Sequence, residues 1–422
     1  MAAALVRHGA AALAALALAP IGGATLLLKP AWREGASERL GLRGPRAAGS
    51  VWVHGASVGE ILAATRLLDA LLQHGRAVVA STNTATGNAV LAYTRPDVPR
   101  CFAPLDHPWC AAAALARVAP AALVLVETEL WPCWIAAAAR RRLPVVVVSA
   151  RISERSLPRY QKLSPLLRGT FDRLSAVGAR SDADAEHFAA LGVAENRISV
   201  TGDLKLEAPT MTAALAPDFA RMLGGVPFWV AASTRPGEEE AVLSAHAAAQ
   251  RAGLASALVL APRHLERIPE LVLLLAARDF RWRRRSDANH APLAAGEVLL
   301  LDTLGELPAV FALACFAFVG GTLAPIGGHN VLEPAYAGRG VLFGPHVGKV
   351  REAAALLLAC GGARAVAHEP ALEIAVTEWL RDPAQADACG AAAQHELARH
   401  HGATDRSCAL VLRVLADAGI RA

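Results

Sequence analysis

One carboxylate stands where a predicted strand, a glycine-rich loop and a helix follow one another. The strand 51–54 ends with His54, the loop 55–59 is built of small residues, and Glu60 falls in the first turn of a helix whose apolar spacing begins at Ile61. This order places Glu60 at the carboxyl edge of a parallel sheet, where open α/β folds bind ligands. A glutamate in a first turn can also serve only to stabilise the helix dipole. The small loop and the adjacent histidine leave room for a substrate, which favours a functional carboxylate.

Two more acids and a lysine follow other predicted strands of the same region. Glu127 and Glu129 come directly after the strand 122–126, and Lys205 follows the strand 198–201. Because the carboxyl ends of parallel strands meet at one edge of a sheet, we expect at least one of the two acids to contact a ligand. A lone lysine is more often a solvated surface group. Its place at the mouth of a predicted cleft favours a role for Lys205.

The second half of the chain carries a denser constellation. Four glycines together with His329, Asn330 and Glu333 follow the predicted strand 316–319. We expect backbone N–H groups of residues 327–330 to bind an anion with help from the dipole of the next helix, and Glu333 to accept hydrogen bonds from ribose hydroxyls. A glycine turn with an asparagine cap is the simpler alternative. The number of glycines and polar groups favours ligand binding.

Two further loops end at the same predicted edge. Pro262 and Arg263 follow the strand 257–261, and residues 303–306 follow the strand 298–301. A guanidinium group presents a fork of N–H donors that matches phosphate oxygens. Arg263 is therefore a candidate phosphate partner.

The pattern Asp182-Ala183-Asp184 looks like a metal-binding motif of some sugar transferases. It follows Ser181 and opens a predicted helix, so helix capping is the better interpretation. The seven cysteines form no CxxC pair and show no zinc spacing, which indicates reduced thiols in a cytosolic protein. We expect neither a metal nor another cofactor.

Strands and helices alternate along the 422 residues, which predicts an α/β protein of two doubly wound domains that face a cleft. The predicted domains are residues 31–207 and 226–422, joined by a linker at 208–225 that contains prolines and glycines. Neither domain shows a full GxGxxG fingerprint. The predicted strands are 51–54, 77–81, 122–126, 145–149, 175–178 and 198–201 in the first domain and 228–232, 257–261, 298–301, 316–319 and 340–343 in the second.

Residues 1–30 predict a membrane anchor. Residues 10–28 carry no charge, which is close to the ~20 residues of a membrane helix, and basic residues follow them. The positive-inside rule then places the globular part in the cytoplasm. A cleaved signal peptide is the alternative, but the cytosolic character of the rest favours an uncleaved anchor that spans the membrane or lies in its surface. The net charge of +5 suits an anionic substrate or membrane face, and no nucleic-acid motif is present.

The motifs and their order resemble those of the 3-deoxy-D-manno-octulosonic acid (Kdo) transferase family, which acts in lipopolysaccharide biosynthesis in Gram-negative bacteria. The matching segments are residues 54–60, 127–132, 150–153, 201–205, 232–234, 262–264, 302–306 and 327–333. The similarity covers nearly the whole chain, and the combination is specific although no single motif is. One departure follows residue 346, where the family usually has a Thr-Phe-Asn-Phe-like run and this chain has Val347-Gly348-Lys349-Val350.

The resemblance implies a GT-B fold with two Rossmann-like domains and an N-terminal hydrophobic anchor helix, held at the cytoplasmic side of the cell inner membrane. It implies transfer of Kdo from CMP-Kdo to the lipid A precursor lipid IVA. By the same resemblance Glu60 is the general base, and Glu127 and Lys205 help to stabilise the transition state. The residues that it implies for contacts with CMP are Pro262, Arg263, Leu304, Gly305, Glu306, Asn330, Val331, Leu332 and Glu333.

The expected reaction is an inverting displacement, in which Glu60 takes a proton from a hydroxyl of the lipid's glucosamine and CMP leaves. The leaving group is a single phosphate, which Arg263 and a helix start of the second domain can stabilise without a metal. Lys205 is the candidate partner of the Kdo carboxylate. Two alternatives stay open: another GT-B enzyme that uses a UDP-sugar and a lipid-linked acceptor, and a non-catalytic membrane-anchored scaffold that has kept the fold.

Overall fold

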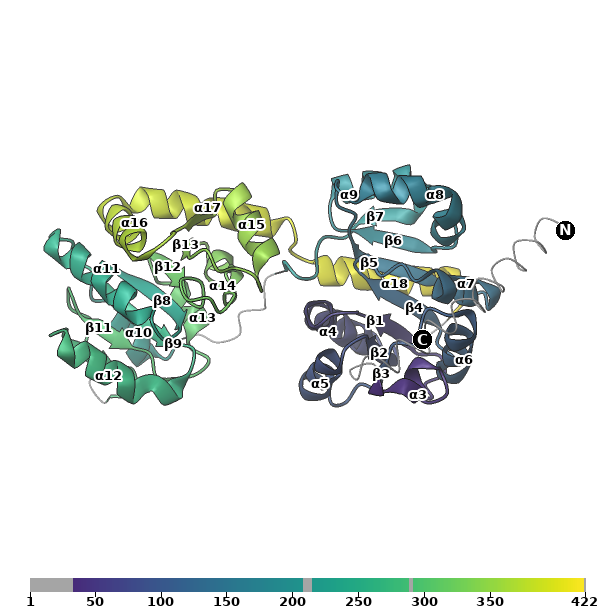
Figure 1. Cartoon of the computed structure of the whole chain (residues 1–422), viewed down its shortest axis with the longest axis horizontal. Coiled ribbons are helices and arrows are strands. Elements are labelled where there is room, and N and C mark those ends of the chain that lie inside the picture. The colour runs from purple at the N-terminus through teal and green to yellow at the C-terminus, as the bar shows by residue number, and fades with distance from the viewer. Residues whose placement is uncertain (1–32, 208–214, 288–290, 421–422) are drawn as a thin grey trace. The chain divides into compact units, whose positions relative to one another are not determined.

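The computed structural model describes residues 33–207, 215–287 and 291–420. These residues form two compact units (Figure 1): residues 33–207 with 400–420, and residues 215–287 with 291–399. The predicted membrane anchor at residues 1–30 lies outside the described residues. Among the residues that are described, no helix combines the length and the apolar composition that crossing a membrane requires.

The first unit is built on a seven-stranded sheet in the order β3-β2-β1-β4-β5-β6-β7, in which every neighbouring pair is parallel. Its strands are β1 (Val51–His54), β2 (Val78–Thr82), β3 (Arg100–Phe102), β4 (Ala122–Val126), β5 (Val145–Ala150), β6 (Ala176–Ala179) and β7 (Ile198–Val200). Its helices are α3 (Ala36–Arg39), α4 (Val58–Gln73), α5 (Ala85–Thr94), α6 (Pro108–Val118), α7 (Pro132–Arg140), α8 (Leu157–Phe171), α9 (Asp182–Ala190), the 3₁₀ turn η1 (Glu195–Arg197) and α18 (Ala403–Asp417). The strand order reverses between β1 and β4, so their carboxyl ends flank the point at which such sheets bind ligands.

Helices cover both faces of this sheet, which explains its almost wholly apolar strands. Along β1, Val51 and Val53 face α4, α5 and α18, while Trp52 faces α6 to α9. Successive side chains of a strand point to opposite faces, so a strand that is covered on both sides has no polar positions to offer. The polar residues that remain collect at the strand ends.

The second unit repeats the plan, with the order β10-β11-β9-β8-β12-β13-β14 and parallel pairing throughout. Its strands are β8 (Phe228–Thr234), β9 (Ala257–Pro262), β10 (Trp282–Arg284), β11 (Val298–Leu300), β12 (Phe316–Val319), β13 (Gly340–Phe343) and β14 (Ala363–Ala365). Its helices are α10 (Pro217–Leu223), α11 (Glu239–Arg251), the 3₁₀ turn η2 (Leu265–Arg267), α12 (Ile268–Ala277), α13 (Leu307–Phe311), α14 (Leu332–Tyr336), α15 (Arg351–Ala359), α16 (Glu369–Arg381) and α17 (Pro383–Ala398). Here the order reverses between β8 and β12.

The prediction of two doubly wound parallel sheets is confirmed, and all eleven predicted strands appear within two residues of their expected bounds. Three strands were missed: β3, β10 and β14. Each has three residues, contains arginine and lies at a sheet edge. An edge strand pairs on one side only, so it is short and lacks the apolar run that identifies a central strand.

Two predicted boundaries are corrected. The segment from residue 400 onward belongs to the first unit rather than the second, because α18 buries Val411 and Leu415 in the same core as Leu67 of α4 (Figure 1, yellow helix). The predicted linker at 208–225 contains α10, whose Phe219 and Met222 are fully buried in the core of the second unit. Its proline and glycines mark the start and end of a helix rather than a flexible connection.

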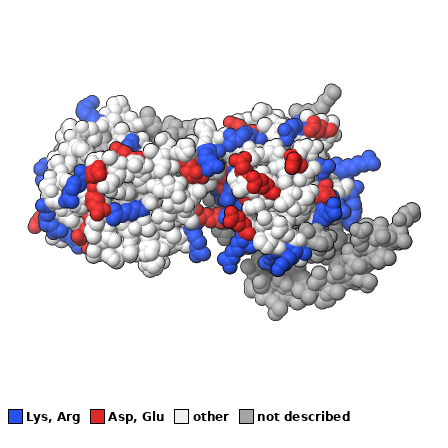
Figure 2. Space-filling model, turned by 90° about the horizontal axis from the view of Figure 1, so that it is seen from above, with Lys and Arg blue, Asp and Glu red and all other residues white. Residues whose placement is uncertain are grey.

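Charges of both signs are mixed on the surface. Figure 2 shows Lys and Arg interspersed with Asp and Glu on the visible face, between broad uncharged areas. This agrees with 42 basic against 37 acidic residues in the whole chain. Neither sign of charge dominates the visible face.

Candidate functional site

Glu60 lies at the start of α4, and its own loop holds its carboxylate. The Ala56 N–H donates to Oε2 at 2.8 Å and the Ser57 hydroxyl donates to Oε1 at 2.6 Å, while Ser57 Oγ accepts the Glu60 N–H at 3.3 Å. Ser57 is the N-cap residue and Glu60 is the third residue of the helix, the pairing of a capping box. A Cβ on Gly55 would lie 3.1 Å from that of Glu60, so a larger residue there would press on Glu60.

The hydrogen bonds of the helix cap do not fill all the acceptor positions of the Glu60 carboxylate. An ionised carboxylate offers about four acceptor positions on its two oxygens, and the loop uses one on each oxygen. Glu60 is buried, with 8% of its surface exposed. The hydrogen bonds from the loop therefore leave about half of its acceptor positions unfilled.

The structure brings Glu127 and Lys205 together with Glu60. The Lys205 ammonium forms an ion pair with Glu127 Oε1. A Cβ on Gly59 would lie 3.5 Å from Lys205 Cε, so the lysine stem lies over the loop that carries Glu60. Burial raises the pKa of Glu127; Lys205 opposes the rise, and the charges of Glu60 and Asp203 add to it. The sites after β1, β4 and β7 therefore form one group.

The backbone is strained at Glu127. Its φ of 62° lies in the left-handed region, which side chains other than glycine rarely adopt. Such strain persists only where the surroundings enforce it, and it concentrates at functional sites. The side chain at this position forms the ion pair with Lys205.

Lys205 is held by residues that sequence reasoning did not single out. Asp203 Oδ1 accepts the Lys205 N–H at 2.9 Å and the Ser149 hydroxyl at 3.0 Å. The Asp203 N–H in turn donates to His400 Nδ1 at 3.2 Å, from the segment that precedes α18. A serine at the end of an apolar strand was the available signal for Ser149; His400 had none, because it is 195 positions from Lys205 in the sequence.

His54 and Glu129 complete the acidic group. The His54 ring is fully buried, 5.0 Å from the Trp134 ring between centroids, and its Nε2 lies 3.9 Å from Glu129 Oε2. Burial lowers the pKa of His54 to about 4, although the hydrogen bond to the Ser81 backbone acts in the opposite direction. Burial, followed by the charges of Glu60 and Glu127, raises the pKa of Glu129 to about 7, while the Trp131 indole opposes the rise. At neutral pH the imidazole is uncharged.

The Asp182-Ala183-Asp184 pattern is a helix cap, as predicted. The Ser181 hydroxyl accepts the Asp184 N–H at 3.2 Å and donates to Asp184 Oδ2 at 2.7 Å. Asp184 Oδ1 also accepts the Ile152 N–H at 3.0 Å. The acid therefore ties the start of α9 to the loop after β5.

In the second unit, a group of cations lies at the carboxyl edge. Burial, followed by the charges of Arg263, Arg235, Lys349 and His264, lowers the pKa of His329 to about 4. These residues follow β9, β8, β12 and β13, which are consecutive in the sheet. Lys349 belongs to the run that departs from the family pattern, and it lies over the glycine-rich loop, since a Cβ on Gly327 would be 3.0 Å from its Cγ.

The expectation that N–H groups of residues 327–330 bind an anion is wrong for two of them. The Gly328 N–H donates to Gly321 O at 2.7 Å and the His329 N–H donates to Gly320 O at 3.3 Å. The helix that follows, α14, has only five residues, so its dipole is small. Asn330 Oδ1 accepts the Leu332 N–H at 3.1 Å, although the N-cap residue of α14 is Val331 rather than Asn330.

Glu333 still lies in the basic group. Asn330 Nδ2 donates to its Oε1 at 3.2 Å. Burial raises the pKa of Glu333, and both this hydrogen bond and Arg263 oppose the rise. Val331 and Leu332 have buried side chains, and the Leu332 N–H is already bonded to Asn330. Pro262, at the end of β9, is buried as well.

The loop after β11 is held differently. Glu306 accepts hydrogen bonds from Arg285 at 3.1 Å and from the Thr303 hydroxyl. Leu304 is 83% exposed and Gly305 has a φ of 85°, so the tip of this loop projects from the unit. The ion pair with Arg285 places Glu306 beside β10, away from the His329 group in the strand order.

Glu238 is an acid that the sequence did not reveal. It is almost fully buried before α11, and its carboxylate accepts five backbone N–H groups. Four come from residues 321–324 in the loop after β12, at 2.7 to 3.1 Å, and one comes from Arg235 at 3.0 Å. The position of the glycine-rich loop thus depends on one carboxylate from the neighbouring strand's loop.

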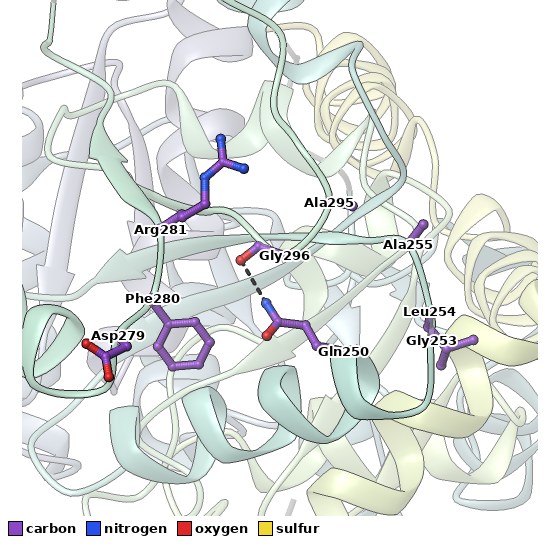
Figure 3. Close-up of a pocket in the computed structure, with 9 residues that line it drawn as sticks. All are labelled: Gln250, Gly253, Leu254, Ala255, Asp279, Phe280, Arg281, Ala295 and Gly296. Carbon is purple, nitrogen blue, oxygen red and sulfur yellow. Dashed lines mark hydrogen bonds between the residues drawn. The ribbon is translucent and has the colours of Figure 1, made fainter.

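A hollow of about 480 Å³ lies elsewhere in the second unit (Figure 3). It is lined by Gln250 at the end of α11, Leu254 before β9, Gly296 before β11 and Phe280 before β10, and Gln250 Nε2 donates to Gly296 O at 2.8 Å. These positions mark the amino edge of the sheet, whereas the acidic and basic side chains described above lie at the carboxyl edge. The hollow is not the site described above.

Comparison with known proteins gives a consistent result. Residues 34–208 match the family model described as 3-Deoxy-D-manno-octulosonic-acid transferase (kdotransferase). The chain is 38% identical over 394 residues to the 3-deoxy-D-manno-octulosonic acid transferase of Bordetella pertussis, covering 89% of this chain and 91% of that protein. It is 34% identical over 388 residues to the protein of the same name from Haemophilus influenzae, covering 89% and 90%.

Solved structures show the same fold at low identity. MurG of Acinetobacter baumannii superposes with a TM-score of 0.52 at 12% identity, covering 87% of this chain and 100% of that one. The glycotransferase of kitacinnamycin superposes with a TM-score of 0.51 at 17% identity, covering 88% and 100%. Both likenesses support two parallel-sheet α/β domains of the GT-B glycosyltransferase type.

Proposed function

The chain belongs to the Kdo transferase family and is a glycosyltransferase, and on that premise we propose that it transfers Kdo from CMP-Kdo to lipid IVA with inversion at the anomeric carbon. The acceptor, the stereochemistry and the roles of individual residues are the content of the proposal. The observation that carries it is the acidic group of the first unit, in which Glu60 retains open acceptor positions beside the Glu127–Lys205 ion pair.

Glu60 acts as the general base. The acceptor hydroxyl loses its proton to the Glu60 carboxylate while its oxygen forms a bond to the anomeric carbon of Kdo. The bond from that carbon to the phosphate oxygen of CMP breaks, and its electron pair leaves with the phosphate. The Ala56 N–H and the Ser57 hydroxyl hold the carboxylate in one orientation, which is the preorganisation that an efficient base requires.

Glu127 and Lys205 act on charge that develops in the reaction. A sugar that loses its leaving group early acquires positive charge at the anomeric carbon, which a nearby carboxylate stabilises. Glu127 is suited to that role because it lies in the acidic group with Glu60 and is paired with Lys205. Lys205 is suited to the carboxylate of Kdo, while its ion pair with Glu127 keeps both side chains in place.

The second unit binds the donor. The charges of Arg263, Arg235 and Lys349 all act on a neutral His329, and in this proposal they bind the one phosphate. In this proposal Glu333 accepts hydrogen bonds from the ribose, and the exposed loop at Leu304 to Glu306 contacts the nucleotide. The cations of the chain serve the leaving phosphate, so no metal is assigned.

The first unit binds the lipid. Arg155 and Arg159 are exposed at the start of α8, in the same unit as Glu60, and with Arg151 they form a candidate contact for the lipid A phosphates. We place the protein at the cytoplasmic side of the inner membrane, attached through residues 1–30. The anionic membrane surface suits the mildly basic chain.

The proposal is tested with the full chain in detergent, CMP-Kdo and lipid IVA, with the lipid product read by mass spectrometry. We expect a mass increase of one or more Kdo residues, and no product when a UDP-sugar replaces CMP-Kdo. The same spectrum counts the Kdo residues added. A lipid that gains no Kdo, or that gains the sugar of a UDP donor instead, would refute the proposal.

A further inference from the structure

His54 has one ring nitrogen with a partner and one without. Its Nδ1 lies 3.2 Å from the backbone oxygen of Ser81, which only accepts hydrogen bonds, so Nδ1 carries the ring hydrogen. The Ser81 hydroxyl, 3.0 Å from Nδ1, also accepts the Trp52 indole N–H at 2.8 Å and is held in place by it. The other nitrogen, Nε2, is therefore a bare acceptor, and it is buried without a hydrogen-bond partner.

The side chain that faces this bare nitrogen is Glu129. Its Oε2 lies 3.9 Å from His54 Nε2, slightly beyond hydrogen-bonding distance. An ionised carboxylate has no hydrogen to donate and would turn its own lone pairs toward those of the nitrogen. A protonated carboxyl group has the one hydrogen that Nε2 lacks, and a small side-chain movement would complete the bond.

The surroundings of Glu129 also favour its protonated form. Glu60 from α4 and Glu127, which lies with Glu129 in the loop after β4, act on Glu129 as negative charges. Tyr160 of α8 adds no positive charge. The neutral His54 supplies none, and Lys205 is already in an ion pair with Glu127. Burial and these two charges raise the pKa of Glu129 to about 7.

We propose that Glu129 is a positioning residue of the transfer reaction: its carboxyl group holds a proton toward Nε2 of His54, which leaves Glu60 as the ionised base. The inference rests on the proposed function, because it concerns the same reaction. Glu129 does not exchange a proton with substrate. It acts through Glu60, because its protonated form adds no negative charge to the acidic group around Glu60. That group must accept a donor that carries an anionic phosphate and an anionic carboxylate.

Wild-type and Glu129→Gln proteins are compared by kcat/KM for Kdo transfer between pH 6 and 8.5. kcat/KM reports groups of the free enzyme, so the wild-type value falls as Glu129 loses its proton. With a midpoint near pH 7, the fall from pH 6 to pH 8 is about tenfold. The glutamine amide keeps a donor for His54 and has no proton to lose, so the variant changes by less than about twofold over the same range.

The control is Glu186→Gln, which removes one exposed carboxylate from α9 of the same unit and should follow the wild-type profile. Parallel profiles for wild type and Glu129→Gln would overturn the inference. So would a flat wild-type profile, or a Glu129→Gln protein that is inactive at every pH, since the ionised form would then be the useful one. A merely structural role for Glu129 would change the level of activity and leave the shape of the profile.

A second measurement does not depend on activity. In protein labelled with ¹³C at glutamate carboxyl carbons, the Glu129 signal is identified by its loss in Glu129→Gln, and we expect it to titrate near pH 7. In His54→Phe the protonated form loses its acceptor, so the midpoint moves lower by about one pH unit. A wild-type midpoint below pH 5, or one that His54→Phe leaves unchanged, would sink the inference even if Kdo transfer is observed. If no transfer is observed, the proposed function fails. The titration still shows whether the Glu129 carboxyl group is protonated.

Discussion

Glu60 and Glu238 occupy matching places in the two units and have opposite surroundings. Each follows the strand at which its sheet reverses order, β1 or β8, and each stands at the start of the next helix. Glu60 bonds within its own loop and lies beside the acids after β4. Glu238 reaches across to the loop after β12 and receives four of its N–H groups.

The two carboxylates differ in how much of their hydrogen-bond capacity is filled. With about four acceptor positions, Glu238 is saturated by its five N–H donors, whereas Glu60 is only half occupied. A saturated carboxylate fixes the backbone around it and has nothing left for a substrate. A half-occupied one is oriented and still able to accept a proton.

The neighbouring loops differ in the same sense. In the first unit the loop after β4 turns Glu127 and Glu129 into the group. In the second, the loop after β12 points its N–H groups at Glu238 and leaves cations at the edge. One parallel-sheet plan thus yields a group of acids in the first unit and a group of cations in the second.

The largest effect on the transfer reaction is expected from substitution of Glu60. Glu60→Gln removes the base and keeps the size of the side chain, so kcat for Kdo transfer should fall by about 10²- to 10⁴-fold. CMP binding, measured by calorimetry, should stay within about twofold of wild type, because the contacts assigned to CMP lie in the other unit. Wild-type turnover in this variant would remove Glu60 from the mechanism and break the comparison.

Glu238→Gln should instead act on structure. The amide replaces an acceptor by a donor that faces N–H groups, which we expect to destabilise the loop by about 3 kcal/mol. Hydrogen exchange measured by mass spectrometry should become faster in peptides that cover residues 321–324. Peptides from β1 and α4 serve as the internal control. Unchanged exchange at 321–324 would mean that these hydrogen bonds do not hold the loop.

Arg263→Ala should weaken CMP binding by about 10- to 100-fold, the equivalent of one hydrogen bond to a charged group. Arg281→Ala is the matched control, because it removes an exposed arginine beside the hollow at the amino edge of the same sheet. Calorimetry with CMP measures both. Equal losses in the two variants would show that net charge, rather than the carboxyl edge, governs nucleotide affinity.

The smallest effect is expected from removal of divalent cations. Because the basic group of the second unit is assigned to the leaving phosphate, chelation by EDTA should leave the transfer rate within about twofold of its original value. Addition of Mg²⁺ after EDTA is the control. A rate that collapses with EDTA and returns with Mg²⁺ would show that the cations of the protein are insufficient.

Much of the fold could be predicted from local patterns in the sequence. Central strands such as β4 and β5 are apolar runs because helices cover both faces, and this signal located them within two residues. The edge strand β10 lacked the signal, since one side of it is unpaired and two of its three residues are arginines. The helix α10 was taken for a linker because proline and glycine mark helix ends as well as loops.

The candidate site could be predicted from the sequence only in part. That Glu60, Glu127 and Lys205 stand at strand ends followed from their order, and the structure brings them together. The glycine-rich loop was misjudged, because it folds back on itself and its own carbonyl groups at Gly320 and Gly321 accept the N–H groups of Gly328 and His329. The order of residues in the loop does not show this fold.

By itself the sequence determined the alternating strands and helices, the polar groups at the strand ends and the family, because each is written in short segments or in their order. Only the tertiary structure decided which groups meet and which of them are already satisfied. It filled Glu238 with backbone donors, left positions open on Glu60, and set Glu129 opposite an unpaired nitrogen of His54. The physical reason is that hydrogen-bond capacity and charge are shared among neighbours in space, and those neighbours come from strands far apart in the chain.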